Sequence, residues 1–224
     1  MSAAPSGFET IRASSLVDEA HRQIRAQILA GELHPGDALR DSVLAEQMGI
    51  SRSPVREALR LLEQSGLVEK TANRSYRITL LAADDVPELA ALRAADEVLA
   101  VRCIVRDRRS LATLDPVIQR LRRAGRDPVE LAAADAAFHA EIVTLAGLPR
   151  LSARFAGLTD QIRLVLIAGG LEQERVAEQM VDNHALLRDL LQTAIDRRST
   201  DEIIPIWEDH VLSGMTTPHL LDPH

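Results

Sequence analysis

The sequence predicts a mostly α-helical chain in two parts: three helices and a β-hairpin over residues 15–80, then an all-α antiparallel bundle over residues 81–224. Three observations predict this arrangement. Apolar residues recur at helical spacing through most of the chain, short strand patterns occur only near residues 67–80, and leucine and alanine are abundant. Residues 1–14 are expected to form a flexible tail. With 46% hydrophobic and 26% charged residues among 224, the chain can bury a core.

The first predicted helix begins at Ser15, a suitable N-cap, and ends before Gly31, which suits a C-cap. Its apolar residues follow one another at spacings of three and four, which places them on one face: Val17, Ala20, Ile24 and Ile28. The residues His34-Pro35-Gly36-Asp37 then predict a turn, so a new element is expected to begin shortly after them.

Two further helices and a hairpin complete the first part. The helices are expected over residues 42–48 and from residues 51–54 to Gly66, and the strands over residues 67–70 and 76–80. A short helix, a tight turn, a second helix and a hairpin follow one another in a winged helix-turn-helix. That fold presents its second helix to the major groove of DNA.

No strand pattern is convincing beyond Asp84. Short breaks rich in glycine or polar residues divide this part into helices expected at residues 84–107, 110–124, 128–146, 151–168, 172–196 and 200–213. Six helices with short connections predict an antiparallel bundle.

Composition excludes several classes of protein. The single cysteine, Cys103, rules out a disulfide within the chain and any site that needs two cysteine ligands. No apolar run reaches the ~18 residues of a membrane span, and no signal segment is evident at the start, so a cytoplasmic protein is expected, at the nucleoid when bound to DNA. Aromatic residues are only 2%, which argues against binding nucleic acid by base stacking.

Charge is distributed unevenly between the two parts. Residues 1–80 carry ten basic and ten acidic residues, and the remaining residues account for the whole net charge of −7. The second part is therefore a poor partner for a polyanion. The first part can bind one if its arginines converge on one face.

Arg52, Arg56 and Arg60 are spaced by four residues, so they form one stripe on the third predicted helix. Ser51 and Ser53 lie at the start of that helix, where hydroxyls and free backbone N–H groups suit a phosphate. An arginine at this place can bind the O6 and N7 edge of guanine with two hydrogen bonds. The alternative is a solvated face with no partner, and the surrounding helix-turn-helix pattern favours DNA.

The segment LRDSVLAEQMGISRSPVREALRLLEQSGLVEK at residues 39–70 resembles the N-terminal domain of GntR-family transcriptional regulators, most specifically in SRSPVREAL and the following Gly-Leu-Val. The resemblance implies that Arg52 and Arg56 contact bases or phosphates and that Ser51 and Ser53 contact phosphates. It also implies that Asn73 and Arg74 form the wing tip, and it offers Arg40, at the entry to the second helix, as a weaker candidate. Ser75 stands where the family commonly has a glycine.

Asp135 and His139 lie four residues apart on one predicted helix, so their side chains point the same way. His184 and His210 come from two later helices and can complete a set of three nitrogens and one oxygen around a divalent metal. Imidazole suits Zn or Ni, and the carboxylate extends the choice toward Mn. Surface or core histidines without a metal are the alternative that this spacing leaves open.

Residues 85–215 resemble the ligand-sensing FCD domain of the FadR-type subgroup, through ADAAFHAEIVTLAG, DNHALLRDLL and WEDHV. The resemblance implies that Asp135, His139, His184 and His210 bind a metal at the bottom of a pocket with open positions for a carboxylate effector. The segment between His184 and His210 is about one turn longer than is typical, so Arg188 is an alternative occupant of the position given to His184. Residues 146–149 also depart from the family, which often has an asparagine there.

Arg93 lies on the first predicted helix of the bundle. An arginine on this helix of an FCD-type domain can face the effector, and arginine binds a carboxylate with a planar fork. The alternative is that Arg93 pairs with Glu97, four residues further on, at the surface.

These features are compatible with three functions. The first is a homodimeric repressor that binds an inverted-repeat operator and responds to a small organic acid bound in a metal-containing pocket. The second is a regulator for which the metal itself is the signal. The third is a metal-dependent hydrolase, which lacks support because no motif places a general base, a nucleophile or a phosphate-binding loop.

Overall fold

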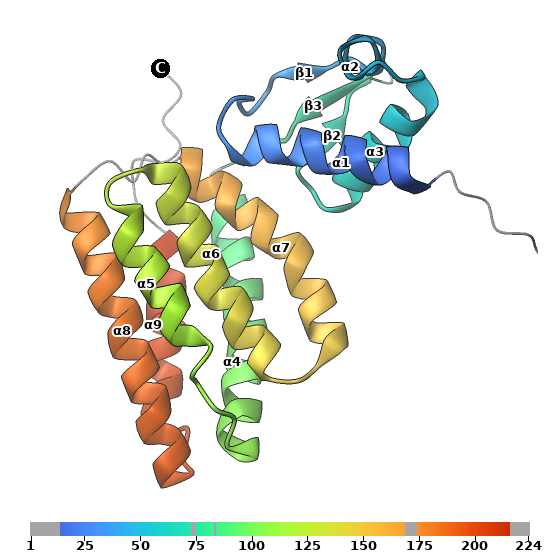
Figure 1. Cartoon of the computed structure of the whole chain (residues 1–224). Helices are drawn as coiled ribbons and strands as arrows, with labels where there is room; N and C mark the ends of the chain where they lie inside the picture. The colour runs from blue at the N-terminus through green and yellow to red at the C-terminus, as the bar shows by residue number, and fades with distance from the viewer. Residues whose placement is uncertain (1–13, 73–74, 83, 169–173, 216–224) are drawn as a thin grey trace, which may run out of the picture.

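A computed structural model describes residues 14–72, 75–82, 84–168 and 174–215, and it confirms a mostly helical chain in two parts (Figure 1). The first part holds three helices and a small sheet: α1 (Ser14–Leu29), β1 (Ala38–Leu39), α2 (Asp41–Met48), α3 (Arg52–Gln64), β2 (Val68–Lys70) and β3 (Tyr76–Ile78). In its described residues, the second consists of helices joined by turns and loops: α4 (Asp85–Asp107), α5 (Leu114–Ala124), α6 (Pro128–Leu145), α7 (Pro149–Ala168), α8 (Glu174–Arg197) and α9 (Ile203–Met215).

The apolar faces of α1 and α3 form the core of the first part. Ala20, Ile24 and Ile28 are at most 1% exposed, as their spacing predicts. They pack with the buried face of α3 and with residues of the sheet, among them Val55, Leu59, Leu62, Leu67 and Ile78. Because α3 buries this face, its opposite face, which carries the arginine stripe, points to solvent.

The predicted hairpin is confirmed as the antiparallel pair of β2 and β3, and a third strand that the sequence does not predict, β1, extends it to a sheet in the order β1-β3-β2. β1 lies directly after the predicted turn and pairs antiparallel with β3, with Leu39 opposite Tyr76. Two residues are too few to show a strand pattern in the sequence. The strand forms because β3 offers it a free edge: Gly36 donates to the carbonyl of Ile78 and Ile78 donates to that of Asp37, each at 3.0 Å.

The bundle core contains the single tryptophan of the chain. Trp207 of α9 is fully buried and lies 6.3 Å from Phe138 of α6, with nearly parallel rings. Residues from α4, α5, α6 and α8 surround this pair in one continuous cluster. Among the described helices, none combines the length and the apolar character needed to cross a membrane.

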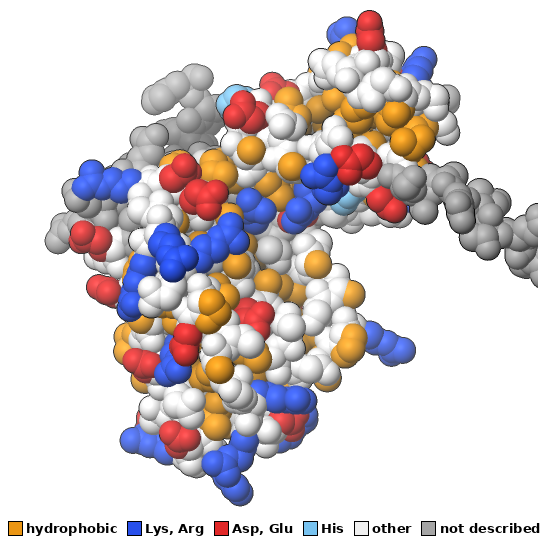
Figure 2. Space-filling model, in the orientation of Figure 1, with side chains coloured by type: hydrophobic (Ala, Val, Ile, Leu, Met, Phe, Trp, Pro, Cys, Tyr) orange, Lys and Arg blue, Asp and Glu red, His pale blue; other side chains and the backbone are white. Residues whose placement is uncertain are grey.

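Helix α7 belongs to the bundle but also contacts the first part. Its Leu164 is buried in the core of the first part, and Asp160 accepts two hydrogen bonds of 2.5 Å from Arg25 of α1. Gln161 donates to the carbonyl of Ser65, at the end of α3, over 3.0 Å. Charged side chains of both signs gather along the seam between α1 and the bundle (Figure 2). We call Asp160, Gln161 and Leu164 the α7 seam.

One residue makes this seam testable by stability. Gly66 has a φ of +75°, and a Cβ there would lie 2.6 Å from the Gln161 side chain. We expect Gly66→Ala to cost about 1–2 kcal/mol of unfolding free energy for left-handed backbone. A further ~0.5–1.5 kcal/mol is expected because Gln161 must move and lose its hydrogen bond to Ser65. Urea unfolding of the full chain measures both.

Gly49 provides the matched control, because it has a φ of +66° and open space where a Cβ would stand. Gly49→Ala is expected to cost only the backbone contribution. Gly66→Ala in a Gln161→Ala background should lose its excess cost. Equal costs for the two glycine substitutions would contradict the seam contact.

Candidate nucleic-acid interface and metal centre

The N-terminal half of α3 presents the predicted DNA-binding residues to solvent. The Arg52 and Arg56 side chains are 63% and 65% exposed, and Ser51 and Ser53 are also exposed. Both guanidinium groups lie near the carboxylate of Asp41, the first residue of α2. These groups line a shallow hollow together with Arg60, Lys70 and Tyr76. A basic, concave surface at an exposed helix is suited to a DNA backbone.

The start of α3 is also open to a phosphate. Ser51 is the N-cap residue, with a φ of −73° and a ψ of 161°, but its hydroxyl makes no capping hydrogen bond. The hydroxyl and the first-turn N–H groups can therefore both turn to a phosphate oxygen.

Of the three remaining DNA-binding candidates, the structure describes only Arg40. Arg40 is exposed at the N-cap position of α2, next to Asp41 in the chain. Asn73 and Arg74, the predicted wing tip between β2 and β3, lie outside the described residues.

The four predicted metal ligands meet inside the bundle. Asp135 and His139 come from α6, His184 from α8 and His210 from α9. The Nε2 atoms of His139 and His184 are 3.1 Å apart, and Asp135 Oδ1 lies 3.1 Å from His184 Nε2 and 3.7 Å from His139 Nε2. One nitrogen from each of the three histidines falls within a 4.8 Å cluster. His184, and not Arg188, therefore occupies the site, because Arg188 instead donates to Asp189.

Partners on the far side of each ring fix the direction of the imidazole nitrogens. His139 Nδ1 lies 2.6 Å from Glu97 Oε2, and His184 Nδ1 lies 2.6 Å from the carbonyl oxygen of Met180. A carbonyl only accepts, so His184 carries its proton on Nδ1 and turns the Nε2 lone pair toward His139. With the carboxylate of Glu97 likewise receiving the Nδ1 proton of His139, two lone pairs face each other at 3.1 Å. Such an arrangement requires a proton or a cation between them.

A divalent metal fits this requirement. Two ligands at ~2.0–2.1 Å from one ion lie about 2.8–3.4 Å apart at octahedral or tetrahedral angles, which includes the separation of the two Nε2 atoms. In metal sites, the other ring nitrogen of a histidine ligand usually donates to a carboxylate or a carbonyl, and His139 and His184 have such partners here.

The charge states suit a metal as well. Burial and the neighbouring His139 and His184 lower the pKa of His210 to about 3, so this ring is neutral. Burial opposes ionisation of Asp135, but Arg93 and His139 outweigh it and hold its pKa well below the usual value. Burial and Arg93 disfavour a charged His139, yet Glu97 and Asp135 raise its pKa overall. Asp135 is therefore ionised and His210 is neutral, the forms in which a carboxylate and an imidazole bind a metal.

Arg93 pairs with Glu97, as the alternative predicts, but in the interior and not at the surface. The distance from Nε to Oε1 is 2.8 Å, and Asp135 also accepts from Arg93 at 3.2 Å. Arg93 nevertheless lines a pocket of about 200 Å³ that also contains Asp135, His184 and His210. The pocket therefore opens onto the candidate metal ligands.

Two residues of the site are not identified from the sequence. Glu97 accepts from Arg93 and from Trp207 Nε1, at 2.7 Å, and it also orients His139. The spacing of four residues between Arg93 and Glu97 predicts their ion pair but not the contacts of Glu97 with His139 and Trp207. The contact with Trp207 joins residues 110 positions apart, and no local pattern reports it.

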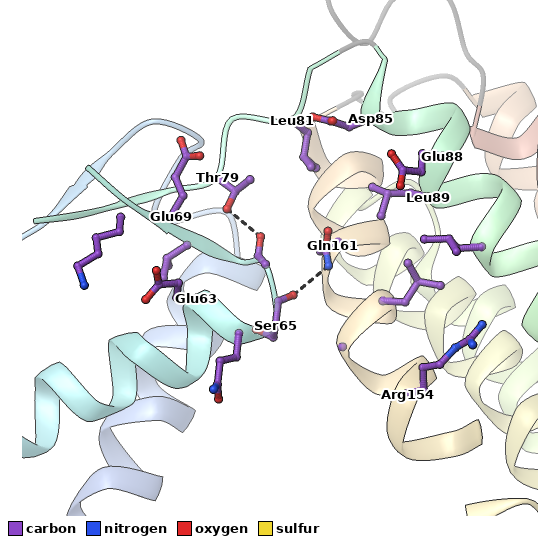
Figure 3. A pocket seen from close by; sticks show the side chains of 17 residues that line it. Glu63, Ser65, Glu69, Thr79, Leu81, Asp85, Glu88, Leu89, Arg154 and Gln161 are labelled. Carbon is purple, nitrogen blue, oxygen red and sulfur yellow. Dashed lines mark hydrogen bonds between the residues drawn. The ribbon is translucent and has the colours of Figure 1, made fainter. Parts of the chain in front are cut away.

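A larger cleft lies between the two parts, with a volume of about 630 Å³ (Figure 3). Glu63, Glu69 and Glu88 stand around it, and Gln161 crosses it to reach Ser65. The end of α3 lines one side of the cleft and α4 and α7 line the other, and the hydrogen bond between Gln161 and Ser65 spans it.

Two family models match this chain. Residues 16–78 match the bacterial regulatory proteins of the gntR family, and residues 88–211 match the FCD domain. The chain belongs to the GntR family, in the subgroup that carries an FCD domain, and its curated relatives are named as HTH-type transcriptional regulators.

Individual relatives agree with this assignment. The uncharacterized HTH-type transcriptional regulator YdhC of Bacillus subtilis is 33% identical over 128 residues, 55% of this chain and 57% of that protein. The "Probable D-xylose utilization operon transcriptional repressor" of Paenarthrobacter nicotinovorans is 32% identical over 128 residues, 54% of each chain. Each match thus spans little more than half of the relative's length.

Solved structures support the fold. A GntR transcriptional regulator from Rhodococcus sp. RHA1 aligns with a TM-score of 0.76 at 21% identity, covering 89% of this chain and 98% of that one. McbR/YncC of E. coli aligns with a TM-score of 0.66 at 20% identity, covering 89% and 95%.

Proposed function

We propose that this chain is a homodimeric repressor whose affinity for an inverted-repeat operator is controlled by a small organic acid, bound in a metal-containing pocket of the bundle. The observation that carries the proposal is the set of convergent donors at the end of the Arg93 pocket, in the same chain as an exposed arginine helix. The name of the Paenarthrobacter relative favours repression. Two copies related by a two-fold axis match an inverted repeat.

Arg52, Arg56, Ser51 and Ser53 are the proposed DNA contacts, with Arg40, Asn73 and Arg74 as further candidates. Asp135, His139, His184 and His210 are the proposed ligands of a zinc, nickel or manganese ion. Once bound, such an ion supplies an open coordination position to a carboxylate oxygen.

Charge explains why an organic acid needs that ion. Arg93 stands against the two carboxylates of Glu97 and Asp135, which leaves one net negative charge when the histidines are neutral. A divalent ion reverses this to one net positive charge, and an anionic ligand is then attracted. Arg93 is the proposed effector-facing arginine, since it lines the pocket while both carboxylates hold its guanidinium.

Helix α7 supplies a connection between the pocket and α3. Leu166 lines the pocket, and the α7 seam contacts α1, the end of α3 and the core of the first part. An effector can change operator affinity only if it binds the DNA-competent and DNA-incompetent arrangements unequally. A small displacement of α7 would alter the pocket and the α7 seam together.

The proposal is tested with a duplex selected from a random library by the wild-type chain and with a scrambled duplex of equal length. The chain is first freed of metal with a chelator, then loaded with Zn²⁺, Ni²⁺ or Mn²⁺. We expect at least one of lactate, succinate and citrate to weaken binding to the selected duplex, and only in the metal-loaded protein.

The same titration separates the alternative. If metal alone changes the affinity and no acid adds to it, the metal is the signal. Unchanged affinity in every condition would contradict control through this pocket.

The ligand set makes its own prediction. We expect His139→Ala to lose most of the bound metal after dialysis, because it removes a ligand whose ring is fixed by Glu97. Metal analysis of the purified chain measures this. His21→Ala, on α1 and outside the site, should keep the wild-type metal content. Full retention by His139→Ala would show that the ligand list is wrong, provided that its melting curve shows a folded chain.

A further inference from the structure

Two arginines of the DNA-facing helix share one acidic partner from a different helix. Asp41 accepts from Arg52 on both carboxylate oxygens, at 2.9 and 3.1 Å, and Arg56 Nε lies 3.6 Å from its Oδ2. The Asp41 side chain is only 20% exposed, whereas both arginine side chains are more than 60% exposed. The partly buried carboxylate of Asp41 therefore restrains Arg52 by hydrogen bonds and attracts Arg56 as an ion pair.

The position of Asp41 is itself fixed. It is the first residue of α2, where a carboxylate is stabilised by the helix dipole. Helix α2 packs directly against α3 through the shared core, with Ala45 buried in it. The packing of the two helices thus sets the position of the carboxylate that faces Arg52 and Arg56.

Orientation matters more for reading bases than for binding phosphates. A bidentate contact with guanine needs the guanidinium fork in one plane and at one place, and a fork fixed beforehand loses less freedom on binding. A phosphate contact needs mainly positive charge. In addition, the negative charge of Asp41 weakens the attraction of this surface for any duplex.

We propose that Asp41 is a positioning residue that sets the sequence selectivity of α3 by holding Arg52 and Arg56. The inference rests on the proposed DNA contacts of these two arginines. It predicts effects of opposite sign: without the carboxylate, binding to arbitrary DNA strengthens while discrimination between sequences weakens. A residue that only supported the fold would weaken both.

Glu57 offers a matched control on α3 itself. It accepts from Arg60, three residues further along the same helix, and both side chains are about half exposed, at 46% and 47%. Glu57→Gln and Asp41→Asn remove the same charge from the same surface. Only the second releases Arg52 and Arg56.

The experiment measures the dissociation constants of the full-length chain for the selected and the scrambled duplex, at two salt concentrations. Asp41→Asn is expected to reduce the ratio of the two constants by roughly 10-fold, one good base contact, while it binds the scrambled duplex at least as tightly as wild type. Glu57→Gln should change both constants together and leave the ratio within about twofold. An unchanged ratio for Asp41→Asn, or the same change in both variants, would overturn the inference.

A double-mutant cycle identifies the path of the effect. Arg52→Lys keeps the charge but cannot form the planar fork. If Asp41 acts through Arg52, adding Asp41→Asn to Arg52→Lys should change the ratio much less than it does in the wild-type chain, and additive effects would overturn the inference. If the melting curve shows that Asp41→Asn does not fold, Asp41→Ser replaces it in the same cycle. If Arg52→Ala and Arg56→Ala keep full selectivity, the proposed contacts fail; if they lose it and Asp41→Asn does not, only the role of Asp41 fails.

Discussion

Glu97→Ala is expected to lower the free energy of unfolding by about 3–5 kcal/mol, the usual cost of removing one partner of a buried ion pair. Glu97 is fully buried and is the common acceptor for Arg93, His139 and Trp207. Its loss leaves a buried guanidinium with one carboxylate and two buried N–H groups without an acceptor. Urea unfolding followed by the fluorescence of Trp207, the single tryptophan, measures the effect where it arises.

Two controls separate charge from packing in this result. Glu97→Gln keeps the shape and an acceptor for Trp207, so it should cost less than alanine. Glu57→Ala removes an exposed carboxylate paired with Arg60 and should leave the unfolding free energy near that of the wild type. A cost below 1 kcal/mol for Glu97→Ala would contradict its role as the acceptor that holds the site together.

Arg52→Ala and Arg56→Ala are each expected to weaken binding to the selected duplex by roughly 10–100-fold, which corresponds to about 1–3 kcal/mol for a lost base contact. Their affinity for the scrambled duplex should fall less, because only one positive charge is removed. Electrophoretic mobility shift or fluorescence anisotropy at fixed salt measures both duplexes.

Arg106→Ala is the control for charge, since Arg106 is exposed at the far end of α4 and pairs with Asp107. It should leave both affinities near wild type. Arg52→Ala and Arg56→Ala proteins that bind the selected duplex as tightly as wild type would remove α3 as the reading helix.

The helices and their buried faces are predictable because each is encoded by residues close together in the chain. The spacing of Ala20, Ile24 and Ile28 predicts the buried face of α1, and that prediction is confirmed. β1 is missed because a two-residue strand has no period of its own and depends on an edge supplied by β3, almost forty residues later.

The candidate metal centre divides in the same way. Asp135 and His139 lie one turn apart on α6, so their convergence is local. The meeting of His184 and His210 with them follows from the resemblance to the FCD domain. Glu97 and Trp207 are tied to the site only by the packing of α4 and α9 against α6, which no sequence pattern contains.

The α7 seam is not predictable from the sequence for a related reason. Asp160 and Gln161 look like ordinary polar residues of a bundle helix, and Leu164 looks like an ordinary core residue. Their partners Arg25 and Ser65 lie about a hundred residues or more earlier in the chain. Only the three-dimensional arrangement shows that one helix belongs to two cores.

The most direct measurement is the ratio of wild-type affinities for the selected and scrambled duplexes at one physiological salt concentration. A regulator that reads bases through α3 should prefer the selected duplex by at least about 10³-fold. Equal affinity for both duplexes would mean that the arginines of α3 attract DNA without reading it.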